Sequence, residues 1–148
     1  MDIDYQTYEA GDFTCLPVMS NGCAASIGYI ADHIPRKGSV IILAQGKDAE
    51  GQWEVAGYIL ATVGDDGIFI HNVHVQELYR RNGVATNLLK IMYRMTEQSG
   101  NYPIKLFVAD NNEAAIKCYR AAGFAVESRI PNCREFGVAT LLMNCGPL

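Results

Sequence analysis

The sequence predicts one α+β domain over residues 1–148, with a mixed, mostly antiparallel central sheet of about seven strands and helices on both faces. Two observations lead to this prediction. Strand-like runs rich in β-branched and aromatic residues alternate, in the second half of the chain, with two amphipathic helical patterns. The length of 148 residues is usual for one domain, and no repeat, linker-like stretch or low-complexity tract divides it.

The predicted strands are separated by clear turn signals. A polar loop bounded by glycine, residues 46–52, predicts a hairpin between the second and third strands. Asp65-Asp66-Gly67 is a second turn signal, so three consecutive strands are expected to run antiparallel. The predicted strands cover residues 3–9, 40–45, 53–63, 68–75, 104–109, 124–130 and 136–143.

Three helices are predicted from apolar periodicity and end signals. Residues 24–33 carry apolar side chains at helical spacing before a proline. Residues 82–99 repeat apolar side chains every three to four positions, and a glycine follows. The third helix begins behind Asp110-x-x-Glu113, which resembles a capping box with Asp in place of Ser or Thr, and runs to about Ala122.

Composition and charge exclude several classes of protein. The net charge is -4 and the basic residues form no long run, which argues against a nucleic-acid partner. No apolar run approaches the roughly 20 residues that cross a bilayer, and the N-terminus is acidic and polar rather than signal-like. We therefore expect a cytoplasmic protein with no membrane partner.

The cysteines do not predict a disulfide framework or a metal site. There are five, an odd number, and no C-x-x-C pair occurs among them. Reduced thiols and no metal are expected. Cys118 lies beside a candidate catalytic residue and is either an acyl-accepting nucleophile or an ordinary packed or partly exposed thiol.

The strongest chemical signal lies where the strand at 68–75 is followed by the helix at 82–99. The hexapeptide Arg80-Arg81-Asn82-Gly83-Val84-Ala85 brings two guanidinium groups to unpaired backbone N–H groups at the positive end of a helix dipole. Gly83 leaves the backbone open to an anion, and the small Ala85 leaves room for a diphosphate. A solvated basic helix start would have the same sequence.

Two other kinds of phosphate site lack their fingerprints in this chain. The sequence contains no G-x-x-x-x-G-K-[ST] and no G-x-G-x-x-G, so a P-loop nucleotidase and a Rossmann dehydrogenase are not predicted.

Two motifs carry a resemblance to a known family. Arg80-x-x-Gly83-x-Ala85 resembles the pyrophosphate-binding motif Q/R-x-x-G-x-G/A of the general amine N-acetyltransferase (GNAT) superfamily. Downstream, Asn112, Tyr119 and Gly123-Phe124 are similar to that family's second motif, in which Tyr follows Asn by seven residues and G-F comes next. The motifs occur in the family's order and at its usual separation, and the predicted order of elements matches.

The resemblance implies an acetyl-CoA-dependent N-acetyltransferase that moves an acetyl group to a primary amine by direct transfer in a ternary complex. Acetyl-CoA would be the co-substrate. The backbone from Arg81 through Thr86 would hold the pyrophosphate, and a free edge at Val73 and Val75 would bind the pantetheine arm. Asn112 would contact the pantetheine amide. The residues implied for the cofactor are Val73, Val75, Arg80, Arg81, Asn82, Gly83, Val84, Ala85, Thr86, Asn112, Ala115 and Lys117.

Two side chains are candidates for proton transfer. The resemblance places Tyr119 near the sulfur as general acid, although a core tyrosine on the same helix face remains an alternative. For the base we consider His71, because strict alternation would put it on the same strand face as Val73 and Val75, whereas His74 would point to the opposite face. A strand histidine that is only hydrogen-bonded, with water as the base, is the other possibility.

The acceptor stays open at this stage. N-terminal protein acetyltransferases of the family commonly carry a tyrosine pair between the last two strands, where this chain has Asn132-Cys133. A small-molecule or peptide amine is therefore expected, with a protein N-terminus or lysine as an alternative. A homodimer is expected only by analogy with the family. A non-catalytic acyl-CoA sensor, and an unrelated enzyme that binds phosphate, also remain.

Overall fold

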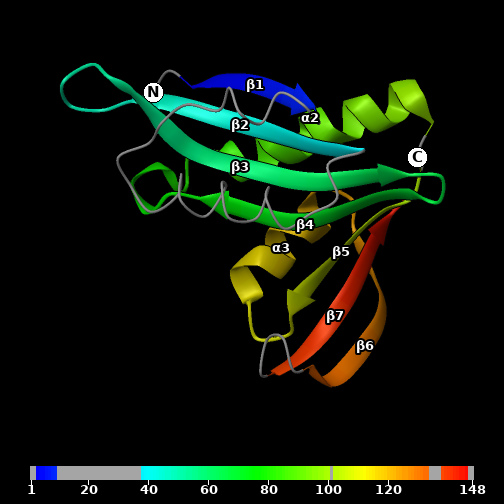
Figure 1. The fold of residues 1–148 in the computed structure, drawn as a ribbon. Helices are drawn as coiled ribbons and strands as arrows, with labels where there is room; N and C mark the ends of the chain where they lie inside the picture. Colours follow the sequence, from blue (N-terminus) through cyan, green and yellow to red (C-terminus); the bar gives the residue numbers. More distant parts are fainter. Residues whose placement is uncertain (1–2, 10–37, 101, 134–137, 147–148) are drawn as a thin grey trace.

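The computed structural model describes residues 3–9, 38–100, 102–133 and 138–146 (Figure 1). Its seven strands form one sheet in the order β1-β2-β3-β4-β5-β7-β6, and two helices pack on it. The elements are β1 Asp4–Glu9, β2 Ser39–Lys47, β3 Trp53–Gly64, β4 Gly67–Val75, the short 3-10 helix η2 Glu77–Tyr79, α2 Val84–Ser99, β5 Ile104–Ala109, α3 Glu113–Ala121, β6 Ala125–Cys133 and β7 Val138–Cys145.

The predicted fold class is confirmed: the sheet is mixed and mostly antiparallel, and each described strand and α-helix agrees with its prediction to within three residues, whereas η2 was not predicted. The helix predicted at residues 24–33 lies outside the described residues. Both described helices pack on the same face of the sheet.

The sheet divides after β4. All neighbouring strands pair antiparallel except β4 and β5, which run parallel and share only three residue pairs, from Ile68↔Ile104 to Ile70↔Leu106. Beyond Ile70 the two strands separate. In Figure 1 β5, β6 and β7 diverge from the broad half formed by β1–β4, and α3 lies near the angle between the halves. Among the described strands, none pairs with the second half of β4 on this side, and we call this side the free edge of β4.

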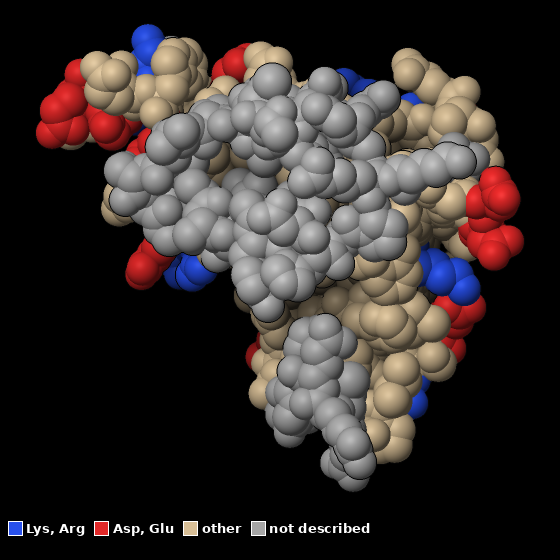
Figure 2. Space-filling view, viewed as in Figure 1, with Lys and Arg blue, Asp and Glu red and all other residues tan. Residues whose placement is uncertain are grey.

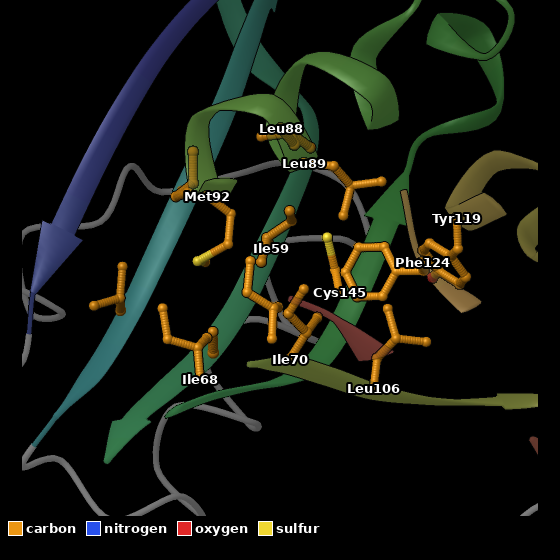
Figure 3. Close-up of a cluster of buried hydrophobic side chains, with 14 of the residues drawn as sticks. Ile59, Ile68, Ile70, Leu88, Leu89, Met92, Leu106, Tyr119, Phe124 and Cys145 are labelled. Atoms are coloured by element: carbon orange, nitrogen blue, oxygen red, sulfur yellow. The ribbon is translucent and has the colours of Figure 1, made fainter. Parts of the chain in front are cut away.

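The core between the helices and the sheet is built from regularly spaced apolar residues. In α2, Leu88 and Met92 are fully or almost fully buried one turn apart, as an amphipathic helix requires. They meet Ile59 and Ile70 from the sheet, and Phe124 closes the α3 end of the same cluster (Figure 3).

Glycine at position 57 allows α2 to begin close against the sheet. A Cβ built on Gly57 would lie 2.6 Å from the His74 carbonyl oxygen and 3.2 Å from Cγ1 of Val84, the first residue of α2. Any side chain there would force strand and helix apart. The start of α2 is thus held beside the end of β4, which brings the two parts of the predicted cofactor site together.

Two further findings concern membrane-spanning helices and groups of side chains that could hold a metal ion. Within the described part of the chain, no helix is long and apolar enough to cross a membrane. Across these same residues, no group of three or more His, Cys, Asp or Glu side chains is placed to hold a metal ion.

Candidate active site

The free edge of β4 presents backbone polar groups toward the gap. The Gln76 N–H donates to the Ala56 carbonyl at 2.7 Å, in register with the β3–β4 ladder. Because opposite residues of antiparallel strands alternate between bonded and non-bonded pairs, Val73 and Val75, opposite Ile59 and Gly57, are non-bonded pairs. Their N–H and C=O groups therefore point away from β3, toward the space beside β5. A second extended chain can bind at this edge.

A row of unpaired N–H groups follows this edge. Among the described residues, no backbone N–H from Arg81 to Thr86 has a hydrogen-bond partner, and the first helical bond runs from the Asn87 N–H to the Gly83 carbonyl. Gly83 is the N-cap with φ 74°, it supplies no side-chain cap, and a Cβ built on it would meet nothing within 4 Å. The orphan donors and the helix dipole favour an anion here.

Polar side chains of the turn hold it open. The Asn82 side-chain amide donates to the carbonyls of Tyr79 at 3.3 Å and Arg80 at 3.1 Å, and Arg80 Nε donates to the Val75 carbonyl at 3.1 Å. Arg81 takes the left-handed conformation, with φ 66°. These bonds engage carbonyl oxygens inside the turn, which leaves the N–H groups directed outward.

The short helix η2 also holds the turn in position. The Tyr79 hydroxyl donates to Glu54 Oε1 at 2.7 Å, and its ring lies against Gly46, where a Cβ would come 2.4 Å from a ring carbon. Burial, followed by Glu54, raises the pKa of Tyr79 to about 12. The β2–β3 hairpin thus fixes the segment that leads into the anion site.

Tyr119 lies at the edge of the core, on α3. The residue is 9% exposed, and its ring is 6.0 Å from that of Phe124 (Figure 3). No described group forms a hydrogen bond with its hydroxyl. Burial, followed by the neighbouring Cys118, raises its pKa to about 12. Both the catalytic and the core interpretation of this residue agree with its position.

The predicted face of His71 was wrong, because β4 contains a β-bulge. Leu60 pairs with Asn72 and Ala61 with Ile70, so His71 is the extra, unpaired residue. Ile68 and Ile70 face the helices before the bulge, whereas Val73 and Val75 do so after it. His71 therefore lies on the opposite face from Val73 and Val75. His74 shares that face with His71, contrary to the prediction.

The surroundings of His71 suit a neutral imidazole. Its Nε2 lies 2.7 Å from Thr62 Oγ1, and its ring is 5.1 Å from that of Phe69. Partial burial lowers the pKa of His71, so the ring is neutral at neutral pH. The pKa of His74 is also lowered, first by burial and then by Arg80, and its ring packs 5.7 Å from that of Tyr58.

The structure corrects the start of α3. Its N-cap is Asn112, whose Oδ1 accepts the Ala115 N–H at 3.2 Å, and Asp110 instead pairs with Arg129 at 3.1 Å. The predicted capping box at Asp110 is therefore wrong. The side-chain N–H groups of Asn112 and the second lone pair of its Oδ1 remain for a ligand, whereas the Ala115 N–H is already used. Lys117 is exposed on α3.

One neighbour of His71 and the β-bulge in β4 were missed by the sequence analysis. Thr62 reaches His71 from β3, a contact between strands that no local pattern reveals. The bulge itself left a signal: the core-facing residues Ile68, Ile70, Val73 and Val75 are spaced by two, three and two. A strand without a bulge would keep a spacing of two throughout.

Solved structures with the same fold are numerous, at low sequence identity. The ribosomal-protein-S18-alanine N-acetyltransferase of Escherichia coli has a TM-score of 0.74 at 18% identity, with 98% of this chain and 94% of that chain covered. Ard1 from Thermoplasma volcanium gives 0.69 at 18%, covering 99% and 98%. A GNAT family acetyltransferase from Elizabethkingia anophelis, with acetyl-CoA bound, gives 0.72 at 14%, covering 98% of each chain.

The family itself is identified by sequence. The acetyltransferase (GNAT) family matches residues 15–124, which is most of the chain and includes the free edge of β4, the turn at Gly83 and Tyr119. The chain therefore belongs to the acetyltransferase (GNAT) family and is an acyltransferase.

Proposed function

We propose that this protein transfers the acetyl group of acetyl-CoA directly to a primary amine. The observation that carries the proposal is the continuity of two binding features: the free edge at Val73 and Val75 leads into the unpaired N–H groups from Arg81 to Thr86. Acetyl-CoA has matching parts in the same order. Its pantetheine arm carries amides that can bind a strand edge, and its pyrophosphate suits a helix N-terminus.

The reaction needs three groups from the protein: a hydrogen-bond donor to the carbonyl oxygen, a base for the amine and a proton donor for the thiolate. The neutral amine nitrogen attacks the thioester carbonyl carbon, and negative charge develops on the carbonyl oxygen. The Val73 N–H, directed into the gap, is the proposed donor for that oxygen. The C–S bond then breaks, the amine loses one proton to a base, and the thiolate gains one. The products are an N-acetyl amine and coenzyme A.

Tyr119 is the proposed donor to the departing sulfur. With a pKa of about 12 it keeps its proton at neutral pH and can hydrogen-bond to a developing thiolate. An ordinary thiol has a pKa of about 8.5. Transfer of the tyrosine proton to the thiolate is therefore unfavourable unless burial also destabilises the thiolate. The proton is therefore expected to move late, as the C–S bond breaks.

His71 is the proposed base, directly or through a water molecule. In the proposal the acid and the base act from opposite faces of the sheet, because the bulge turns His71 away from the face on which α3 packs. Because its pKa is lowered, the imidazole is uncharged at neutral pH, and the ring nitrogen that carries no hydrogen can accept a proton. This arrangement suits direct transfer, because the donor and the acceptor each have a separate face.

The test compares Tyr119→Phe with the wild type. We expect turnover to fall by about 10²-fold or more, in the usual range for a general acid, while the Kd for coenzyme A changes less than threefold. Thiol release with a panel of amines gives turnover, and calorimetric titration with coenzyme A, ATP and NAD gives affinity. Unchanged turnover would remove the assignment of Tyr119. Preference for ATP or NAD would refute the whole proposal, and coenzyme A binding without thiol release would indicate a sensor.

A further inference from the structure

A strip of aromatic rings lies where β4 and β5 begin to separate, on the face of the sheet that carries His71. The ring of Phe69 on β4 lies 5.4 Å from that of Phe107 on β5 and 5.1 Å from that of His71. Phe69 and Phe107 come from the two strands that separate immediately beyond Ile70. The strip therefore lies where the two strands diverge.

Phe107 is not needed by the core. Ile104, Leu106 and Val108 on β5 are buried in the cluster beneath the helices, and Phe107 points to the other face with 40% of its surface exposed. A ligand that covers the exposed part of this phenyl ring would gain free energy by removing apolar surface from water. Its contact with Phe69 fixes one ring face and leaves the rest available.

Two acidic side chains of the β5–β7 half are paired with cations. Lys105, on the same face of β5 as Phe107, lies 3.2 Å from the carboxylate of Glu127. The next acidic group along β5, Asp110, is held by Arg129 at 3.1 Å. In Figure 2 the charged side chains that can be seen over β5–β7 lie mainly along the edges of that part of the molecule. A polyamine or aminoglycoside would need free carboxylates, and these described acids are engaged.

We propose that the Phe69–Phe107 pair binds an aromatic or branched apolar group carried close to the acceptor's primary amine. This inference rests on the proposed acetyl transfer and names the class of acceptor. The apolar group would lie over the two rings, and the amine would then be near His71 at one end of the strip. Offset or edge-to-face ring contacts favour an aromatic group over an aliphatic one of equal size.

The experiment measures the ratio of kcat/KM for 2-phenylethylamine to that for ethylamine, with acetyl-CoA saturating. In the wild type the aromatic amine should be preferred at least tenfold, and spermidine should be a poor acceptor. Phe107→Ala should lower the ratio about tenfold, the value of one good ring contact. Phe107→Leu should retain part of it, since the surface stays apolar.

Val126→Ala on β6 is the matched control, because Val126 is also 40% exposed and lies two strands away from β5. It should leave the ratio unchanged. An equal loss in Phe107→Ala and Val126→Ala, or a wild-type preference for spermidine, would overturn the inference while leaving acetyl transfer intact. Failure of coenzyme A to bind, with no thiol release from any amine, would overturn both.

Discussion

Two glycines at the ends of α2 allow a matched test of the anion site. Gly83 has φ 74° and ψ 14°, Gly100 has φ 74° and ψ 13°, and a Cβ on either would meet nothing within 4 Å. Alanine in this left-handed conformation costs about 1–2 kcal/mol, reduced by the loss of freedom in the unfolded chain. A net loss of about 1 kcal/mol is expected for each variant.

The size of the protein converts this loss into a shift in Tm. An unfolding entropy of about 2.1 cal/mol/K per residue gives roughly 0.3 kcal/mol/K for 148 residues, so each substitution should lower Tm by about 3 °C. Only the new methyl group in Gly83→Ala would lie where the pyrophosphate contacts the N–H groups. Losing one charge-assisted hydrogen bond costs about 1.5–3 kcal/mol, or about 10- to 100-fold in Kd.

Thermal melts without ligand give the Tm of each variant, and calorimetric titration gives its Kd for coenzyme A. We expect equal Tm shifts in Gly83→Ala and Gly100→Ala, and weaker coenzyme A binding in Gly83→Ala alone. An unchanged Kd in Gly83→Ala, or the same rise in both variants, would show that the turn at Gly83 does not bind the pyrophosphate.

Two further predictions concern the proton path and α3. Burial lowers the pKa of His71 below 6.5, so the rate should fall as pH drops through a midpoint under that value, and His71→Ala should lose this acidic limb. Thr62 Oγ1 lies 2.7 Å from His71 Nε2 and can accept a hydrogen bond from the imidazolium, so we expect Thr62→Val to move the limb to still lower pH and Thr62→Ser not to; an unmoved limb in Thr62→Val would refute the role of Thr62. Asn112→Ala should lower Tm by about 3 °C through loss of an N-cap worth about 1 kcal/mol, whereas Asn112→Ser should keep Tm and raise the KM for acetyl-CoA. A normal KM in Asn112→Ser would argue against the pantetheine contact.

The fold was predictable because its signals are local. Period-two strands, the period-three-to-four pattern of α2 and the glycines at its ends lie within short stretches of sequence. The free edge was implied by the family resemblance and agrees with the short β4–β5 ladder. The N-cap of α3 was placed at Asp110 rather than Asn112 because both residues can cap, and only the pairing of Asp110 with Arg129 decides between them.

The site was less predictable because its geometry depends on contacts between strands. Strict alternation put His71 on the wrong face, since one inserted residue reverses every side chain beyond it. The contacts of His71 with Thr62 and of Phe69 with Phe107 join residues from neighbouring strands, and sequence spacing carries no information about them.

The bulge gives one strand two separate functions. Without it, alternation along β4 would continue unbroken, and either His71 would point into the helical core or Val73 and Val75 would leave it. With it, Val73 and Val75 keep their side chains in the core and their backbone groups at the free edge. His71 meanwhile stays on the opposite face beside Phe69 and Thr62. In the proposed direct transfer, one strand would bind the acyl donor through its backbone and the acceptor through its side chains.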